Sequence, residues 1–486
     1  MVNLEQPQRP ILGGTDGYRG VATRAPGPGL MNPATVAALS YVQTKVRLEQ
    51  GGERLTVVGR DRRASGPALM NAAIAGILAA GGDVLPVGIA PTPTVQKLAE
   101  LLEAGAGGVV TASHNPPKYN GWKYMIARYI NGMLGHYKPS SDEVRTISNR
   151  YWEIVDSGLA LPSEPVGRIT EQTQLLDLYC RHVTESIAAE FGERPLEGKI
   201  LVYDGANGAA TEVTPKILEA LGATVERFAC CNDGVDNEHC GATHLEGLRG
   251  YLLQRPDLVR NPNFIGAMAN DPDADRVMGL GAYIGPDDKM HFLELNGNHM
   301  MEMLAKNQPG MVGTDYTNDA SIKRIGELGV EFEFCRNGDT NVTNALLEKQ
   351  LLGQPWTRGI EFSGHIVDTL WLPSGDGIRT LAWVAAYAAM TSTNLYELAV
   401  SMPLQPENLI NVELPKGTNA KALMGNQAIL AAVSNAELAL AGTSGRLLVR
   451  ASGTEPVVRI WAVGPDENTV LTATRGIEAS IKALAK

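Results

Sequence analysis

The sequence has little of the positive charge that binding to nucleic acid or to an anionic membrane surface requires. Acidic residues outnumber basic ones among its 486 residues, and the formal net charge is -11. We therefore expect no nucleic-acid or membrane partner, and positive contacts to an anionic ligand must be gathered locally in a cleft. The sequence also lacks a bilayer-spanning apolar segment and a signal-peptide core. These absences predict a cytoplasmic protein.

Cysteine is scarce and irregularly spaced. The five cysteines are Cys180, Cys230, Cys231, Cys240 and Cys335. An odd number without regular spacing predicts free thiols in a reducing compartment. Three of them lie near His239 in the sequence, but the paired CxxC spacing of zinc sites is absent, so we do not predict a zinc site there.

Hydrophobic residues make up 44% of the chain and charged residues 20%, which is typical of a folded globular protein. The length is too great for one ordinary core and predicts three or four domains. Polar, proline-bearing stretches mark the expected boundaries. The predicted domains are 1–166, 167–286, 287–402 and 403–486.

An internal repeat predicts the architecture of the first three domains. Residues 54–88, 199–228 and 310–334 each read as a strand, a helix, a glycine and a second strand. This order is that of a βαβ crossover, so we expect three related α/β domains with mixed, mostly parallel sheets. Residues 444–464 read instead as two strands joined by a turn, and 467–486 as an amphipathic helix. The C-terminal domain is therefore predicted to be α+β.

An acidic motif, ANDPDADR, predicts a metal site. Asp271, Asp273 and Asp275 alternate with Pro272 and Ala274. Three carboxylates this close repel one another unless a cation lies among them, and their oxygens suit Mg²⁺. An exposed acidic turn is the alternative. The further ligands and the glycine of an EF-hand are missing.

A serine follows a predicted strand within GGVVTASHNPPKYNGWKYM, residues 107–125. The prolines, asparagines and glycine after Ser113 form a rigid loop, and Lys123 follows ten residues later. In one interpretation Ser113 caps a turn and His114 is a surface imidazole. In the other, a phosphorylated Ser113 supplies an oxygen to the metal, which favours phosphoryl transfer. Arg276, next to the acidic motif, would hold the phosphoryl group.

Two further motifs are suited to a sugar phosphate. The stretch RASGTEPVVR offers a guanidinium, two hydroxyls and backbone N–H groups to a phosphate, with a plain hairpin turn as the alternative. Its residues are Arg450, Ser452, Gly453 and Thr454. In GIEFSGHIVD, the alternating residues Glu361, Ser363 and His365 can face one polyol, although a solvated loop would carry the same pattern. The glycine-rich stretch GGTDGYRG carries Arg19 and indicates nothing by itself.

Taken in order, GTDGYRG, TASHNP, DPDADR, ExSGH and RxSGTEP resemble the α-D-phosphohexomutase superfamily over nearly the whole chain. The resemblance implies four domains around a central cleft, three α/β and one α+β. It also implies that Ser113 is a phosphoserine, that Lys123 assists proton transfer, and that His114 and Arg19 belong to the active site. The implied Mg²⁺ ligands are Asp271, Asp273, Asp275 and the Ser113 phosphate. The implied substrate-binding residues are Arg276, Glu361, Ser363, His365, Arg450, Ser452, Gly453 and Thr454.

The resemblance implies a mutase that moves phosphate between O6 and O1 of a hexose phosphate through a bound bisphosphate. A hexose bisphosphate is the expected activator, a phosphosugar the expected partner, and a monomer or homodimer the expected state. GTDGYRG and LLVRASGTEPVVRIW resemble the phosphoglucosamine mutase branch, whereas SHNPPKYNGWK and DPDADR resemble phosphoglucomutase and phosphopentomutase relatives. Phe362 and Thr340 depart from residues that relatives carry. We favour glucosamine phosphate over glucose or mannose phosphate; a sugar phosphatase and a non-catalytic sensor are more remote alternatives.

Overall fold

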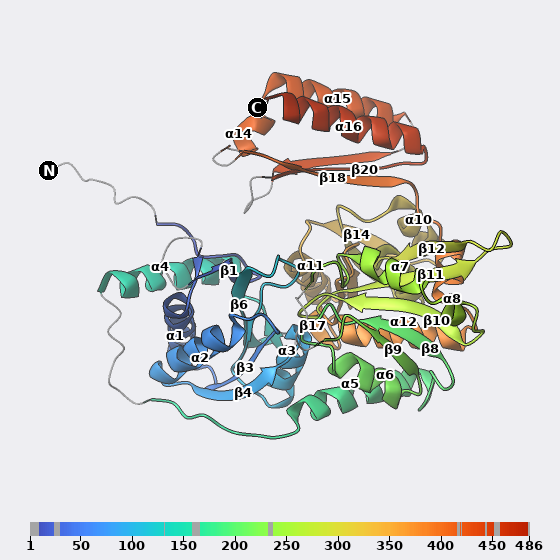
Figure 1. Cartoon of the computed structure of the whole chain (residues 1–486). Helices are drawn as coiled ribbons and strands as arrows, with labels where there is room; N and C mark the ends of the chain where they lie inside the picture. The colour runs from blue at the N-terminus through green and yellow to red at the C-terminus, as the bar shows by residue number, and fades with distance from the viewer. Residues whose placement is uncertain are drawn as a thin grey trace.

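The computed structural model describes residues 9–23, 30–130, 132–157, 166–231, 237–415, 418, 420–442, 445–451 and 457–484. Four β-sheets follow one another along the chain, each covered by helices (Figure 1). The first three sheets mix parallel and antiparallel pairs, and the fourth is a small antiparallel sheet. This is the predicted series of three α/β units and one α+β unit.

The first sheet has the strand order β2-β1-β6-β5-β3-β4, with β7 paired to β6. Strands β5, β3 and β4 are parallel, as the predicted crossover requires, and the long strand β6 returns antiparallel. The strands are β1 (Tyr18–Ala22), β2 (Leu30–Met31), β3 (Leu55–Arg60), β4 (Asp83–Ile89), β5 (Ala106–Val110), β6 (Tyr119–Ile130) and β7 (Met133–Tyr137). The helices are α1 (Pro33–Glu49), α2 (Gly66–Ala79), α3 (Thr92–Leu101) and α4 (Ser141–Ser157).

The second sheet has the order β12-β11-β10-β8-β9, and its centre is the fully buried strand β10. Gly222, with a φ of 105°, ends the turn between α6 and β9 in a conformation that favours glycine. The strands are β8 (Ile200–Asp204), β9 (Thr224–Phe228), β10 (Phe264–Asn270), β11 (Val277–Ile284) and β12 (Met290–Leu295). The helices are α5 (Leu175–Phe191), α6 (Val213–Ala220), α7 (Leu245–Leu253) and α8 (Pro256–Val259).

The third sheet has the order β14-β13-β15-β16-β17. Asparagine and aspartate side chains cap the N-termini of several of its helices. The Asn318 side chain, for example, accepts a hydrogen bond from the backbone N–H of Ala320 at the start of α10. The strands are β13 (Gly310–Thr314), β14 (Glu331–Cys335), β15 (Arg358–Ile360), β16 (Ile366–Asp368) and β17 (Leu372–Gly375). The helices are α9 (Gly297–Ala305), α10 (Asp319–Glu327), α11 (Asp339–Leu351), α12 (Gly377–Met390) and α13 (Leu395–Ser401).

The fourth sheet is antiparallel, with the order β18-β20-β19 and helices on one face (Figure 1). The predicted hairpin and closing helix are β19, β20 and α16. The strands are β18 (Glu407–Glu413), β19 (Arg446–Ala451) and β20 (Val457–Val463). The helices are α14 (Ala420–Met424), α15 (Gln427–Ala441) and α16 (Glu467–Leu484).

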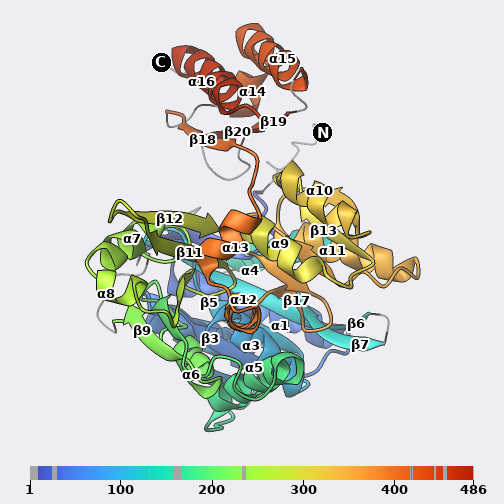
Figure 2. The ribbon, with the colours of Figure 1, turned by 90° about the vertical axis from the view of Figure 1, so that its right-hand side faces the viewer.

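The first three units share one hydrophobic core. Val57 of the first sheet, Leu201 of the second and Met311 of the third belong to a single cluster of buried side chains. Helix α12 supplies much of this core, and Figure 2 shows it at the centre of the body. The fourth unit has its own cluster, which includes Ile460 and Ile477, and projects from the body (Figures 1 and 2). A small cluster in which Trp461 packs on Tyr316 joins it to the third unit.

The predicted domain division stays a prediction. The boundary at 286/287 falls between β11 and β12, which pair with each other in the second sheet. Among the described helices, none has the length and hydrophobicity of a membrane crossing. All five cysteines are free thiols.

Candidate active site

Ser113 lies in the turn between β5 and β6, at the carboxyl end of β5. Its side chain is buried, and its φ of 51° is left-handed, a region that non-glycine residues rarely occupy. The backbone N–H of Ser113 donates to Thr111 Oγ1 at 2.9 Å. The serine is therefore held in a strained turn and is neither a surface residue nor a simple turn cap.

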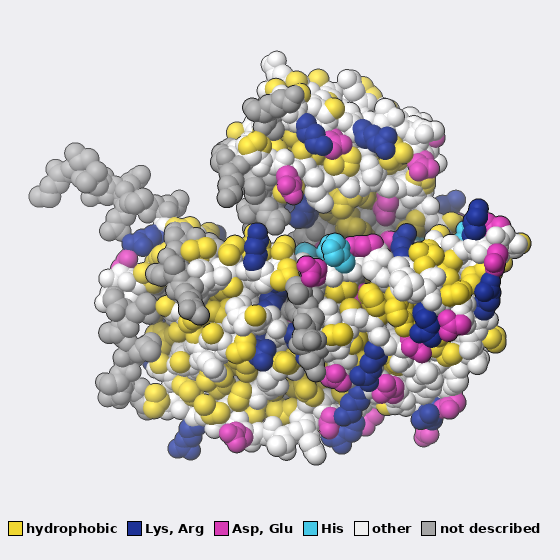
Figure 3. Space-filling view, viewed as in Figure 1, with side chains coloured by type: hydrophobic (Ala, Val, Ile, Leu, Met, Phe, Trp, Pro, Cys, Tyr) yellow, Lys and Arg dark blue, Asp and Glu magenta, His cyan; other side chains and the backbone are white. Residues whose placement is uncertain are grey.

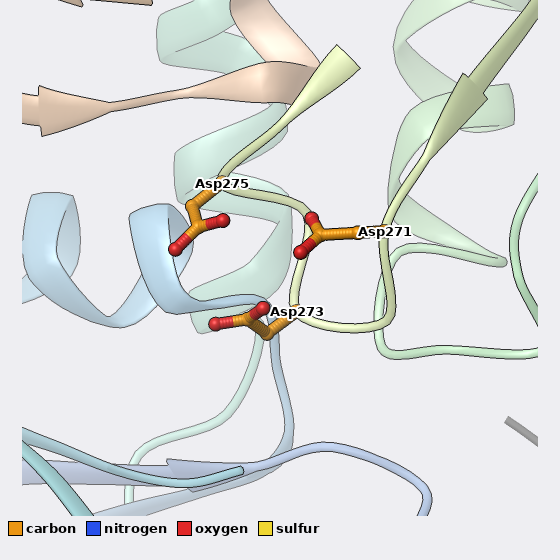
Figure 4. Close-up of side chains that lie close together, drawn as sticks. All are labelled: Asp271, Asp273 and Asp275. Carbon is orange, nitrogen blue, oxygen red and sulfur yellow. The ribbon is translucent and has the colours of Figure 1, made fainter. Parts of the chain in front are cut away.

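The acidic motif forms the loop between β10 and β11. Carboxylate oxygens of Asp271, Asp273 and Asp275 lie within 4.8 Å of one another, and all three side chains are buried (Figure 4). The alternation in sequence becomes convergence because the loop turns tightly through Ala274, whose φ is 58°. The alternative of an exposed acidic turn is excluded by this burial.

The three carboxylates fit a divalent cation. Asp273 Oδ1 is buried and has no hydrogen-bond partner among the described residues. Burial and the neighbouring carboxylates of Asp275 and Asp273 raise the pKa of Asp271 to about 7. Hard oxygen donors gathered in this way are the ligands that Mg²⁺ prefers. Within the described part of the chain, no other cluster of His, Cys, Asp and Glu meets the geometry of a metal site.

The serine and the acidic loop meet, although they come from different units of the fold. Ser113 Oγ donates to Asp271 Oδ2 at 2.7 Å. Thr92, at the start of α3, donates to Asp273 Oδ2 at 2.6 Å and fixes the acidic loop against the first unit. The arrangement therefore places a nucleophilic oxygen directly beside the candidate metal ligands.

Lys123 lies on β6 and points at the same carboxylates. Its Nζ donates to Asp273 Oδ2 and Asp275 Oδ2, both at 2.7 Å. Burial opposes the charge of this ammonium, but Asp16, Asp273 and Asp275 hold its pKa well above the ordinary value. Lys123 is therefore a charged proton donor in this structure.

His114 and Arg276 lie together beside Ser113. Arg276 Nη1 is 3.1 Å from His114 Nδ1, and Ser113 Oγ is 3.4 Å from the same nitrogen. The charge of Arg276 and burial lower the pKa of His114 well below its ordinary value. The imidazole is therefore neutral, and Arg276 supplies the positive charge beside the serine.

The predicted sugar loop joins β15 to β16. His365 Nδ1 is 2.8 Å from Glu361 Oε2, and His365 Nε2 is 2.9 Å from Asp275 Oδ1. Burial opposes the imidazolium, but Asp275 and Glu361 raise the pKa of His365 to about 10. Ser363 is half-buried beside them. The loop is thus tied to the acidic loop and is not a freely solvated segment.

The remaining predicted residues lie around these loops. Arg19, on β1, pairs with Asp16 and donates to Asn115 Oδ1 at 3.3 Å. Arg450, on β19, lies over the ring of Tyr316 at 5.1 Å. The other residues of the predicted phosphate loop, Ser452, Gly453 and Thr454, lie outside the described residues. Figure 3 shows a notch between the C-terminal unit and the body, with acidic and histidine side chains along its lower side.

Sequence reasoning missed an ion-pair cluster that joins the first and third units, in which Lys138 and Asp339 are buried and Asp16 is partly exposed. Lys138, just after β7, donates to both carboxylate oxygens of Asp339 at 2.9 and 2.7 Å and to Asp16 at 2.5 Å. The backbone N–H of Gly338 donates to Glu361 Oε1 at 2.7 Å, so the cluster reaches the sugar loop. Asp16 lies within the motif GTDGYRG, which is the sequence signal that could have directed attention to this position.

The sequence matches three profiles of known domains. Residues 10–132 match phosphoglucomutase/phosphomannomutase α/β/α domain I, 290–404 match α/β/α domain III, and 409–473 match the C-terminal domain. These matches cover the predicted serine loop, the sugar loop and the phosphate loop.

Curated relatives align over almost their whole length. A phosphoglucosamine mutase of Moorella thermoacetica is 35% identical over 96% of this chain and 98% of its own. A phosphoglucosamine mutase of Pseudoalteromonas translucida is 31% identical over 97% of this chain and 98% of its own.

Solved structures share the fold. A phosphoglucomutase/phosphomannomutase family protein from Burkholderia thailandensis has a TM-score of 0.73 at 21% identity, covering 97% of this chain and 98% of its own. N-acetylphosphoglucosamine mutase of Aspergillus fumigatus, in complex with GlcNAc-6P and magnesium, has a TM-score of 0.59 at 16% identity, covering 99% and 97%.

Proposed function

The chain belongs to the phosphoglucomutase/phosphomannomutase family of the α-D-phosphohexomutase superfamily, and we propose that it converts glucosamine 6-phosphate into glucosamine 1-phosphate. Membership makes it a phosphosugar mutase, an isomerase. The observation that carries the catalytic assignment is the 2.7 Å contact of Ser113 Oγ with Asp271.

In the proposed reaction, Ser113 carries the phosphoryl group. The bond between phosphorus and Ser113 Oγ breaks as a bond to the free sugar hydroxyl forms, which gives a bound hexose bisphosphate. The bisphosphate turns over and returns its other phosphate to Ser113. Lys123 gives a proton to the departing Ser113 Oγ and takes up the proton of the sugar hydroxyl, while Arg276 offsets the charge of the phosphoryl oxygens.

The proposed metal is one Mg²⁺ ion held by Asp271, Asp273, Asp275 and the Ser113 phosphate. When bound, Mg²⁺ supplies charge stabilisation to the phosphoryl oxygens. The buried, unpartnered Asp273 Oδ1 supports this site. Glu361, Ser363 and His365 are proposed to bind the sugar hydroxyls, and Arg450 with Ser452, Gly453 and Thr454 the phosphate that is not being transferred.

The identity of the sugar is the most specific part of the proposal. Support for glucosamine phosphate comes from the names of the curated relatives, which are at least 31% identical over nearly the full chain. Phe362, which packs on Tyr316 at 5.5 Å between ring centres, and Thr340 are the nearby departures from relatives. A hexose bisphosphate is the proposed activator. A cytoplasmic location and a monomeric or homodimeric state stay predictions.

A substrate panel tests the proposed function. Purified protein is incubated with Mg²⁺, hexose bisphosphate and the 6-phosphates of glucosamine, glucose and mannose, and each sugar 1-phosphate is measured. We expect the highest kcat/KM for glucosamine 6-phosphate and no turnover by Ser113→Ala. Equal rates on glucose and mannose phosphates with none on glucosamine phosphate would overturn the substrate, and an active Ser113→Ala variant would overturn the nucleophile.

A further inference from the structure

Arg63 is a buried arginine that no motif of the site contains. It follows β3 in the stretch GRDRRASG, three residues before α2 begins. Its side chain has a relative exposure of 0%. A fully buried guanidinium is costly unless its charge is paired and its N–H groups are all bonded, so its surroundings indicate what it is for.

The guanidinium uses all five of its N–H donors, four of them on the serine loop. Nη2 donates to the carbonyl oxygens of Ser113 at 2.6 Å and Asn115 at 2.7 Å. Nη1 donates to the carbonyl oxygens of Pro116 and Tyr119, both at 2.9 Å. One planar group thus gathers four carbonyls of a seven-residue segment.

The fifth donor and the positive charge are matched by Asp61. Arg63 Nε donates to Asp61 Oδ2 at 3.0 Å, and the backbone N–H of Arg63 donates to Asp61 Oδ1 at 3.1 Å. The Asp61 side chain is also fully buried. The ion pair therefore has no net charge, and every N–H donor of the arginine side chain has a hydrogen-bond partner.

The serine loop needs an external support of this kind. Its residues 111–118 form no helix or strand, and Ser113 holds a left-handed φ. Carbonyls in such a turn lack the regular partners that a helix or strand supplies. Arg63 contacts three carbonyls of this turn and that of Tyr119, where β6 begins. Asn237 Nδ2 donates to the carbonyl of His114 at 2.8 Å.

We propose that Arg63 is the positioning residue of the nucleophile loop. Through the four carbonyl contacts, it sets the place of Ser113 Oγ relative to the acidic loop and the sugar, without touching the reacting atoms. This inference rests on the proposed function for its kinetic consequence. A displacement of the nucleophile by about 1 Å can cost about 100-fold in rate, so a positioning residue has a measurable effect.

Arg47 offers a matched control in the same unit. It is also buried, and it donates to the carbonyls of Leu55 and Arg54 and to Thr56 Oγ1. None of these contacts reaches the serine loop. Arg47→Met therefore removes a buried, carbonyl-binding guanidinium from the first unit and leaves the loop's own contacts in place.

Hydrogen exchange tests the positioning directly and needs no substrate. In Arg63→Lys and Arg63→Met we expect faster amide exchange in peptides covering 111–120, whereas Arg47→Met exchanges faster only around its own contacts. Arg63→Lys keeps the positive charge, and it is the variant to measure if Arg63→Met does not fold. Unchanged exchange of 111–120 in Arg63→Lys would overturn the proposal whether or not the chain is a mutase.

Kinetics separate positioning from general stability. For Arg63→Lys we expect kcat to fall about 100-fold while KM changes less than about threefold, whereas Arg47→Met keeps kcat per folded enzyme. Added guanidinium, far below denaturing concentration, is expected to restore part of the activity of Arg63→Ala but not of Ser113→Ala. Wild-type kcat in Arg63→Lys would overturn the proposal; an inactive wild-type chain would overturn the proposed function instead.

Discussion

In this site, acidic and basic side chains lie close together, and their burial removes most of the screening by solvent. Three buried carboxylates lie beside three cations. Lys123 and His365 contact them directly. Burial opposes the charge of Arg276, but the charges of Asp271 and Asp275 raise its pKa. Buried charges of one sign are tolerated only when paired, so removal of one partner leaves the others uncompensated. The site residues should therefore be sensitive even to isosteric changes.

Asp273→Asn is the isosteric substitution that tests the proposed metal site most directly. Asp273→Asn keeps the shape but removes a charged oxygen donor from the proposed metal site. We expect the Mg²⁺ concentration for half-maximal activity to rise at least about 10-fold and kcat to fall roughly 100-fold. A Mg²⁺ titration of the initial rate measures both quantities. Asp287→Asn, in an exposed turn, is the control; an unchanged Mg²⁺ dependence of Asp273→Asn would contradict the metal assignment.

His136 predicts how stability depends on pH. Its Nε2 is 2.7 Å from the carbonyl oxygen of Ala104, and burial lowers its pKa to about 4. Because the folded state binds the His136 proton more weakly than the unfolded state, protonation favours unfolding. The contribution of neutral His136 to the free energy of unfolding is therefore complete above about pH 6.5, and it is lost as the pH falls toward 4, at up to about 1.4 kcal/mol per pH unit. Urea midpoints between pH 7 and 4.5 should fall less steeply in His136→Gln than in the wild type. An equal slope in both proteins would contradict the account; exposed His291→Gln is the control.

At the scale of elements, the site residues stand where strands end and helices begin. Ser113 follows β5, the acidic loop follows β10, and Asp339 begins α11. The sequence predicted these elements because each repeat combines an apolar strand, a helix and a glycine in a local pattern. It also predicted Ser113 and the three aspartates, because their motifs are continuous in sequence.

The contacts between elements could not be predicted in the same way. Arg63, Thr92 and Lys138 act through partners 50 or more residues away. Nothing local distinguishes them from surface charges or turn residues. Their roles arise only when the parallel and antiparallel strands bring separate loops to one edge of the sheets.

The beginning of α12 illustrates how one element depends on a single side chain. Asp376 accepts the backbone N–H of Arg379 at 2.9 Å, the hydroxyl of Tyr179 at 2.9 Å and the indole N–H of Trp371 at 2.8 Å. Asp376→Ala removes the cap and leaves two buried donors unpaired. We expect the free energy of unfolding to fall by roughly 3 kcal/mol, measured by urea unfolding. A loss comparable to that of the exposed cap variant Asn426→Ala would contradict the assignment.

At the scale of the whole molecule, three units form one body and the fourth is held by few contacts. Arg446 of β19 carries much of this attachment. It pairs with Asp319 at 2.8 Å, donates to the carbonyls of Asp315 and Thr317, and lies over the Phe334 ring of the third unit at 4.9 Å. The proposed phosphate loop belongs to this attached unit.

Loosening the fourth unit should weaken substrate binding more than chemistry. Arg446→Ala removes the ion pair and both carbonyl contacts. We expect KM to rise about 10-fold with kcat changed less than about threefold, and the radius of gyration in X-ray scattering to increase. Arg475→Ala, exposed on α16, is the control. An unchanged KM and scattering curve would contradict this role of Arg446.

The central claim is that Ser113 carries a phosphoryl group that it exchanges with the sugar. Peptide mass spectrometry of the protein, after incubation with hexose bisphosphate and Mg²⁺, measures this directly. The account predicts phosphate on the peptide that contains Ser113. If that phosphate carries an isotopic label, the label should move into the sugar when a hexose monophosphate is added, because the other phosphate of the sugar then returns to Ser113. Turnover with no phosphate on Ser113 at any stage would contradict it.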